Sequence, residues 1–371
     1  MNRFDVCVRG AGIVGQSLAL SLARQGLGVA LVPEPEPAAA PAREDVRAYA
    51  LNAASVSLLR TLKVWDALPP HAATAVQDMR IEGDAAGGVL AFSAWQQRVT
   101  ELAWITDAAV LEQCLASAVR YAPHVTVMRE APPAPLVALC EGRDSASREA
   151  LGVVFERHDP GHRAIAARLT TDAPHQNTAR QWFRSPDVLA LLPFDTPRPD
   201  HSFALVWSLP GDQARALMDL SPADFETHLF EATGGACGPL ALAGERASWP
   251  LLQGRAQAWC GPGWVLLGDA AHVVHPLAGQ GLNLGLADVA ALSAVIARRE
   301  TWRPLGDPKL LRRYERERHL PTVAMGGLTD GLLQLFSQDQ VSLRELRNRG
   351  MGLVNHLTPL KRWLTSRALN S

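Results

Sequence analysis

The chain has 371 residues and a formal net charge of −1, and 47% of its residues are apolar. This length is enough for two structural units, and the near-neutral charge excludes a global electrostatic basis for nucleic-acid binding. The five cysteines are scattered, which fits neither a metal site nor a disulfide framework, so we expect reduced thiols in a cytoplasmic protein. No secretion signal or bilayer-spanning apolar run of ~20 residues is expected.

The first elements predict a nucleotide-binding turn. Residues 4–8 and 29–32 are typical of buried strands and residues 12–25 of a helix, which together make a βαβ unit of a parallel sheet. Between strand and helix, three glycines fit the pattern G-x-G-x-x-G: Gly10, Gly12 and Gly15. They allow a tight turn, close approach of a pyrophosphate and close helix packing, and the helix N-terminus attracts phosphate.

The acid that binds the ribose in such units is expected just after the second strand. Pro33 stands there, and Glu34 follows at once. We predict that Glu34 takes this role in a shifted loop, with Glu36 as the alternative. The motif alone does not distinguish FAD from NAD.

Later segments alternate between mixed and strand-rich character. Helices are predicted over 52–62, 107–120, 281–299 and 308–371, and strands over 71–96, 136–140, 153–250 and 264–267. We therefore predict an α/β fold with a discontinuous dinucleotide-binding domain, a β-rich domain and C-terminal helices. The dinucleotide-binding domain is expected over 1–70, 97–155 and 251–330. The β-rich domain is expected over 71–96 and 156–250, and the C-terminal helices over 331–371.

The run from Gly268 to Gly285 reads GDAAHVVHPLAGQGLNLG. A buried strand delivers Asp269, whose carboxylate can accept a hydrogen bond from a ribityl hydroxyl. A loop follows, and the helix that begins near Gly281 directs its N-terminus at the pyrimidine edge of a flavin. The predicted cofactor contacts of this run are Gly268, Asp269, Gly279, Gln280, Gly281, Leu282 and Asn283.

This run resembles the second FAD motif of the class A flavoprotein monooxygenases, and HPLAGQGLNLG resembles the ubiquinone-biosynthesis hydroxylases among them. Arg47 begins a segment similar to the family's Arg-x-x-Ala-Leu, whose arginine lies near the cofactor. Glu141 and Gly142 resemble its Asp-Gly motif, with glutamate in place of aspartate. The resemblance implies a Rossmann-like FAD-binding domain of the para-hydroxybenzoate-hydroxylase type, with an inserted β-rich substrate domain.

The resemblance also implies an activity. An aromatic ring of a polyprenylated phenol is hydroxylated in ubiquinone biosynthesis through a flavin C4a-hydroperoxide, with O2 as co-substrate and NAD(P)H or a reductase protein as electron donor. His275 and Pro276 are expected at the reactive side of the flavin. Residues 188–192 and 203–209, with Trp207, line an apolar substrate pocket or form ordinary sheet core.

Two alternatives to this activity stay open. One is another flavoenzyme reaction, such as reduction of prenyl chains. The other is a weakly FAD-binding scaffold of the quinone-biosynthesis complex, motivated by Pro33, Glu141 and a short segment at 128–135. The last 32 residues hold six basic residues and one acid. They are consistent with a solvated helix face, with a partner protein, or with peripheral contact on the inner face of an anionic membrane.

Overall fold

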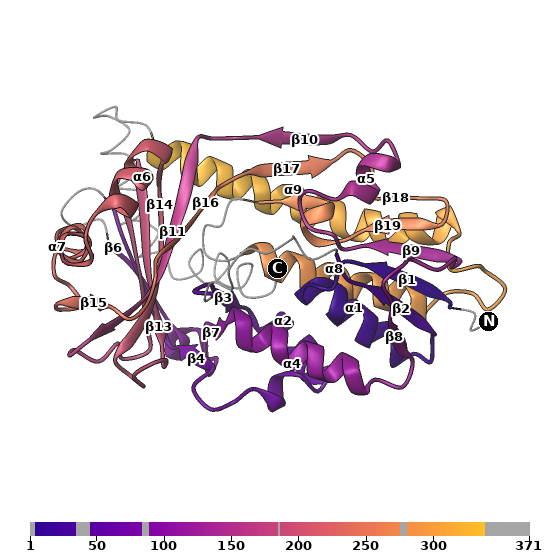
Figure 1. Cartoon of the computed structure of the whole chain (residues 1–371), viewed down its shortest axis with the longest axis horizontal. Helices are drawn as coiled ribbons and strands as arrows, with labels where there is room; N and C mark the ends of the chain where they lie inside the picture. The colour runs from indigo at the N-terminus through magenta and orange to yellow at the C-terminus, as the bar shows by residue number, and fades with distance from the viewer. Residues whose placement is uncertain (1–3, 35–44, 84–88, 185, 275–279, 338–371) are drawn as a thin grey trace.

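The computed structural model describes residues 4–34, 45–83, 89–184, 186–274 and 280–337, with residues 280 and 323–337 as backbone. A six-stranded sheet with helices α1 (Ile13–Ala23) and α8 (Gln280–Ala297) lies at one end of the molecule (Figure 1). An eight-stranded sheet lies at the other end. The predicted α/β class is confirmed.

The six-stranded sheet follows from short runs of apolar residues that are buried on both faces. Its strand order is β18-β19-β9-β1-β2-β8, parallel except for the β18–β19 pair. The strands are β1 (Val6–Arg9), β2 (Val29–Val32), β8 (Val125–Val127), β9 (Leu136–Leu139), β18 (Cys260–Gly261) and β19 (Trp264–Leu266). Helices α1, α4 (Ala108–Tyr121) and α8 share one apolar core with this sheet.

The eight-stranded sheet has the order β15-β11-β14-β13-β12-β5-β6, with β16 also paired to β11. Its strands are β5 (Asp78–Glu82), β6 (Val89–Ser93), β11 (His162–Thr171), β12 (Thr178–Arg184), β13 (Asp187–Phe194), β14 (Ser202–Pro210), β15 (Leu240–Leu242) and β16 (Ala247–Pro250). Alternate residues of β11 to β14 form a core with α6 (Gly211–Asp219) and α7 (Pro222–Thr233) on one face.

Strands dominate residues 153–250 as predicted, and helices α6 and α7 are two elements in this range that the strand pattern did not indicate. Ser221 caps α7 by accepting a hydrogen bond from the backbone N–H of Asp224 at 3.2 Å, and Pro222 occupies the first turn. Gly234 ends the helix in the left-handed region at φ +60°. These are ordinary start and stop signals of a helix.

Two small three-stranded sheets complete the strands. One contains β3 (Ala48–Leu51), β7 (Ala103–Asp107) and β4 (Ala73–Val76), and contacts both α8 and β13. The other contains β10 (Phe155–His158), β17 (Gln253–Ala256) and β20 (His272–Val273), and runs between the two ends of the molecule (Figure 1). The remaining elements are α2 (Ala53–Thr61), α3 (Ala94–Gln97), α5 (Ala146–Ala150), α9 (Pro308–Ser337) and two short 3-10 turns, Trp65–Ala67 and Gly268–Ala270.

Arg168 joins the eight-stranded sheet to the small β3 sheet. Its guanidinium donates to the backbone carbonyl of Arg47 at 2.8 Å and pairs with Asp107 at 3.0 Å. It also lies 4.0 Å from the centre of the Phe194 ring. Since Asp107 caps α4 as well, one buried arginine connects three elements.

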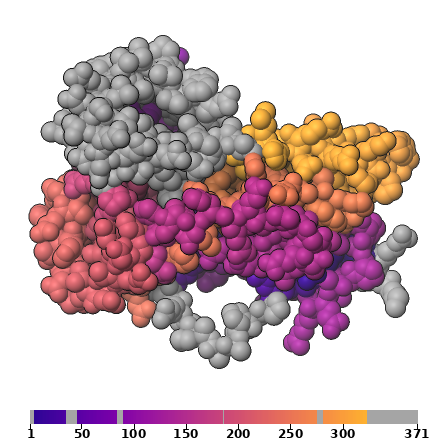
Figure 2. Space-filling view, turned by 90° about the horizontal axis from the view of Figure 1, so that it is seen from above, coloured from indigo at the N-terminus to yellow at the C-terminus, as the bar shows by residue number. Residues whose placement is uncertain are grey.

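Helix α9 carries the predicted C-terminal helical region as far as Ser337, and residues 338–371 lie outside the described residues. In the space-filling view, the first part of α9 (residues 308–322, yellow) and the residues near 200–240 (salmon) lie toward opposite ends (Figure 2). Among the described residues, none of the helices combines the length and apolar character needed to cross a bilayer.

Candidate functional site

A cavity of about 650 Å³ lies between the two large sheets. One wall follows the carboxyl ends of β1, β2, β9 and β19, where open parallel sheets bind ligands. The opposite wall is one face of the eight-stranded sheet, and β3 supplies a third side. Of the predicted cofactor contacts, the cavity is lined by Gly12, Glu34, Arg47, Gly142, Asp269, Gly281 and Leu282.

The first glycine motif forms the turn that its spacing predicts. Gly10 has φ +96°, and a Cβ there would collide with the carbonyl oxygen of Cys140 at the end of β9. A Cβ at Gly15 would collide with the carbonyl oxygen of Gly10. Gly12 is the N-cap of α1, no side chain caps that helix, and the space above Gly12 is open. The uncapped end of α1 therefore faces the cavity and suits an anion.

Two acids reach the cavity from this wall. Glu34 lies there despite Pro33; burial, then the nearby Glu141 and Asp144, raise its pKa. Asp269 lines the cavity, and desolvation by the surrounding protein raises its pKa. Each carboxylate is placed where a hydroxyl of a bound ligand can donate to it.

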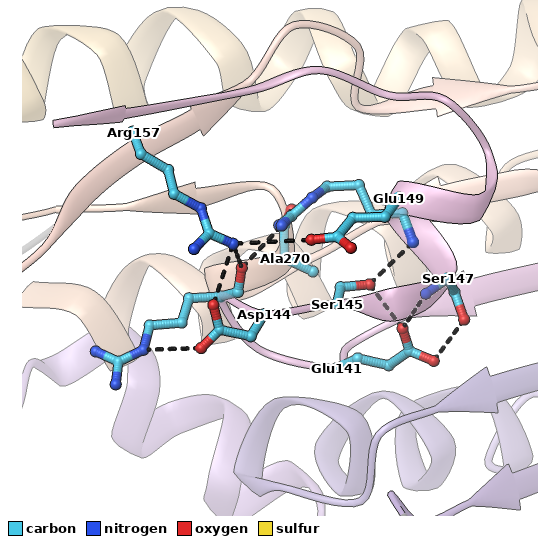
Figure 3. A network of polar contacts seen from close by, with 9 residues as sticks. Glu141, Asp144, Ser145, Ser147, Glu149, Arg157 and Ala270 are labelled. Atoms are coloured by element: carbon cyan, nitrogen blue, oxygen red, sulfur yellow. Dashed lines mark hydrogen bonds and ion pairs between the residues drawn. The ribbon is translucent and has the colours of Figure 1, made fainter.

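Glu141 has a different position from the one expected for a cofactor ligand. One carboxylate oxygen accepts hydrogen bonds from the Ser145 hydroxyl at 2.6 Å and the Ser147 backbone N–H at 3.1 Å (Figure 3). The other accepts from the Ser147 hydroxyl at 2.6 Å and pairs with Arg9 at 2.9 Å. Burial opposes ionisation, but these hydrogen bonds hold the pKa of Glu141 below its ordinary value. Glu141 thus shapes the turn whose next residue, Gly142, lines the cavity.

A buried arginine fastens this turn to the second motif. Arg148 donates to the carbonyl oxygen of Ala270 at 2.9 Å and to that of Arg143 at 2.8 Å. Its guanidinium stacks 4.0 Å from the centre of the Phe155 ring. Arg148 was not predicted as a site residue, because a match to a sequence motif does not show in which direction a side chain points.

Below the second motif lies a buried ion-pair network centred on Asp288. One of its oxygens accepts from the Gly268 backbone N–H at 3.0 Å and contacts His272 Nε2 at 2.7 Å, and the other accepts from Arg318 Nε at 2.7 Å. Burial would raise the pKa of Asp288, but His272 and Arg318 together hold it below its ordinary value. Helix α9, through Arg318, thereby helps to fix the loop that carries Asp269.

Asn283 is buried and ties α8 to β3 and α2. Its side-chain oxygen accepts from the Asn52 backbone N–H at 3.0 Å and the Ser55 hydroxyl at 2.7 Å, and its amide donates to the Ala50 carbonyl at 2.8 Å. The structure therefore brings Gly281 and Leu282 to the cavity but not Asn283.

The other predicted site residues are placed as follows. Gly10, Gly15 and Gly268 do not line the cavity. They support the wall at the carboxyl ends of β1, β2, β9 and β19, which we call the cofactor wall. Gln280 begins α8 and is described as backbone. His275, Pro276, Gly279 and the alternative acid Glu36 lie outside the described residues.

Arg47 and Tyr49 line the third side of the cavity. Arg47 pairs with Asp45 at 2.7 Å and lies 3.6 Å from Glu112. Burial raises the pKa of Tyr49 to about 12, so its hydroxyl stays protonated at neutral pH.

The sheet wall corrects one expectation about the substrate pocket. Val188, Ala190 and Leu192 of β13 line the cavity as predicted, together with Val206 and Ser208 of β14. Trp207 points to the opposite face, where its ring lies 6.2 Å from that of Phe225 in the core under α6 and α7. Successive residues of a strand point to opposite faces of the sheet. Because Val206 and Ser208 face the cavity, Trp207 between them faces the core.

Near the β13–β14 hairpin, His175, Asp195 and Asp200 bring potential metal ligands within 4.8 Å of one another. Asp195 contacts His175 Nε2 at 3.3 Å and also accepts from Thr74 and the Asp200 backbone N–H. These hydrogen bonds within a turn explain why the three side chains lie close together without a metal ion.

Comparison with known proteins identifies the family of this chain. The family model described as FAD binding domain matches residues 3–131 and 133–325. The chain is 29% identical over 392 residues to ubiquinone hydroxylase UbiL of Rhodospirillum rubrum, covering 99% of this chain and 90% of the relative. It is 30% identical to 3-demethoxyubiquinol 3-hydroxylase of Escherichia coli, covering 98% of each.

Solved structures show the same fold at lower identity. The probable FAD-dependent monooxygenase PqsL of Pseudomonas aeruginosa is similar with a TM-score of 0.75 and 19% identity, covering 95% of this chain and 100% of that one. The p-nitrophenol 4-monooxygenase PnpA of Pseudomonas putida is similar with a TM-score of 0.76 and 16% identity, covering 98% of this chain and 97% of that one.

Proposed function

This chain belongs to the FAD-binding domain family and, within it, to the monooxygenases of ubiquinone biosynthesis, and we propose that it hydroxylates the ring of a polyprenylated phenol. It is an FAD-dependent aromatic hydroxylase with O2 as co-substrate. The observation that carries the proposal is a single cavity with a backbone cradle for a dinucleotide on one wall and a largely apolar sheet on the other.

The residues of the cofactor wall fit FAD. The uncapped N-terminus of α1 beside Gly12 suits the pyrophosphate, and Glu34 lies where a ribose hydroxyl can donate to it. Asp269 would accept from the ribityl chain, and Gly281 and Leu282 would border the flavin. We keep Arg47 as a cofactor neighbour and assign Glu141 an indirect role through the turn that presents Gly142.

When bound, reduced flavin supplies the activation of O2. The protein contributes binding, orientation and exclusion of water, since the sheet wall is mostly apolar and can hold a ring against the flavin site. NAD(P)H or a reductase protein would supply the electrons. His275 and Pro276 remain proposed neighbours of the reacting ring.

The scaffold alternative is not favoured. Besides the short segment 128–135, its motivation is that Pro33 and Glu141 would weaken FAD binding. Glu34 nevertheless reaches the cavity, and Glu141 makes four contacts with three residues that order its turn. Peripheral contact with an anionic membrane, and with other quinone-biosynthesis proteins, remains a proposal for the basic segment 340–371.

The test has two stages. The purified protein is titrated with FAD while flavin absorbance and fluorescence are followed, and the holoprotein is then given a prenylated phenol, a reductant and ¹⁸O2. We expect stoichiometric FAD and one labelled oxygen in the product. Absence of FAD binding at high concentration contradicts the assignment as a flavoenzyme, and flavin oxidation without a labelled product contradicts hydroxylation.

A further inference from the structure

The strand register defines the sheet wall of the cavity residue by residue. Three rows of paired side chains on β11 to β14, β5 and β16 face the cavity. The side chains that line it are Met79, Ala166, Ala179, Gln181, Val188, Ala190, Leu192, Val206, Ser208 and Trp249. Apart from the indole of Trp249, only Gln181 and Ser208 in this group are polar.

Arg180 also borders the cavity, but its partner across the ladder is Leu191, whose side chain lies in the core under α6 and α7. Its guanidinium therefore points to the other face of the sheet. Charge is thus absent from the side chains of this wall as far as the structure describes it.

Neither Gln181 nor Ser208 has a hydrogen-bond partner among the described residues, and both border the cavity. A glutamine amide offers two donors and an acceptor, and a serine hydroxyl offers one donor. Polar groups enclosed by apolar neighbours normally find a partner, so a ligand that fills this cavity has to provide one.

The two residues are placed diagonally on the wall. Gln181 pairs with Ala190, and Ser208 pairs with Val188, which is two residues along the same strand β13. Two strand spacings and a two-residue offset separate their Cα atoms by about 12 Å. A flat ring lying over Val188 and Ala190 would have one polar side chain on each side.

We propose that Gln181 and Ser208 are specificity-determining residues that hold oxygen substituents on two sides of the substrate ring, while small apolar side chains contact its plane. This inference rests on the proposed function and names the residues that select the ring. The preferred substrate is then an aromatic ring with at least two oxygen substituents, because a ring with one oxygen would leave one of the two groups unpaired.

The test uses FAD-loaded protein and measures binding of two ligands of similar size, 4-methoxyphenol and 4-ethylphenol, by the change in flavin absorbance. The variants are Gln181→Leu and Ser208→Ala. The matched controls are Gln213→Leu on the exposed side of α6 and Ser57→Ala on α2, both on the surface. FAD affinity is measured in parallel to show that each variant folds.

For 4-methoxyphenol, we expect each cavity variant to weaken binding about fivefold, the effect of one hydrogen bond, and the controls to leave it unchanged. For 4-ethylphenol, only one of the two variants should weaken binding, since that ligand has a single oxygen. The inference is overturned if either variant binds 4-methoxyphenol like the parent protein, if both variants weaken both ligands equally, or if the parent holoprotein binds neither ligand.

Turnover separates this inference from the proposed function. Normal hydroxylation of a prenylated phenol with unchanged KM in both variants would overturn the role of Gln181 and Ser208 and leave the function in place. The expected binding pattern without any hydroxylated product would support the recognition site and overturn the function.

Discussion

The two walls of the cavity differ in the groups that they present to a ligand. The cofactor wall presents backbone at Gly12 and Gly142 and the carboxylates of Glu34 and Asp269. It is held in place by polar networks around Glu141 and Asp288. The sheet wall consists of mostly apolar side chains on long strands that are paired through their backbones. Backbone recognition requires particular residues in a fixed order, whereas a side-chain wall can change its selectivity one residue at a time.

The largest effect on FAD affinity should come from breaking the backbone wall at Gly15. In Gly15→Val, the added carbons collide with the Gly10 carbonyl oxygen and displace α1 from the turn. We expect FAD affinity to fall about 100-fold, the equivalent of roughly 3 kcal/mol of overpacking. Flavin titration measures it.

The control for this change is Gly26→Ala. Gly26 has φ +81° but open space around its Cβ position, so only backbone strain of about 1–2 kcal/mol is added and FAD affinity should persist. Stoichiometric FAD in Gly15→Val at micromolar concentration would show that the close contact is not needed.

A second large effect, on the free energy of unfolding and not on FAD affinity, is expected from the network that supports the cofactor wall. Asp288→Asn removes the charge that pairs with buried Arg318, so the free energy of unfolding should fall by about 3–5 kcal/mol at pH 7. Asp66→Asn, in an exposed pair with Arg60 at 3.9 Å, should cost less than about 1 kcal/mol. Denaturant titration compares the variants.

The same network gives a pH dependence with a defined sign. Because the folded protein holds the pKa of Asp288 below its ordinary value, the stabilisation is present above the unfolded pKa of about 3.9 and is lost as pH falls through the lowered folded value. The difference between the parent protein and Asp288→Asn should therefore be constant from pH 7 to 5 and shrink below about pH 4. A constant difference down to pH 3 would contradict the assignment.

The smallest effect should come from the sheet wall. Ala190→Leu adds three carbons to the middle of that wall, where the substrate ring is proposed to lie. We expect KM for the phenol to rise about tenfold, equivalent to about 1.4 kcal/mol of lost fit, with unchanged FAD affinity. Ala241→Leu, on exposed β15 of the same sheet, is the control. Equal losses of FAD and phenol binding would show that the two walls are not independent.

The cofactor wall was largely predictable from sequence because its physics is local. Gly10, Gly12 and Gly15 require a turn between a strand and a helix, and that turn is present. Glu34, expected at a ribose from its position after β2, does line the cavity, and its contact with a ribose stays a prediction. The sequence did not predict the direction of the Glu141 side chain. The Asp-Gly-like motif indicated its position in the chain, but hydrogen bonds from the neighbouring serines determine where its carboxylate points.

The sheet wall was not predictable in the same way. Which face a strand residue occupies depends on pairing partners that are distant in sequence. The sequence therefore left open whether Trp207 lines the pocket or belongs to the sheet core, and the strand register turns it to the core. Gln181 and Ser208 carry no motif, so only the ladder brings them together. Helices α6 and α7 were not predicted because they lie among the strand patterns of residues 153–250, although α7 carries a Ser221 cap, Pro222 in its first turn and Gly234 at its end.

The strand order of the parallel sheet also determines when the protein can first hold its flavin during synthesis. Gly10 lies against the carbonyl of Cys140, and β9 in turn pairs with β19 near residue 265. The binding turn is thus translated among the first residues, but its supporting neighbours leave the ribosome much later. We therefore expect flavin to bind only after the residues near 265 have been synthesised and the sheet is complete.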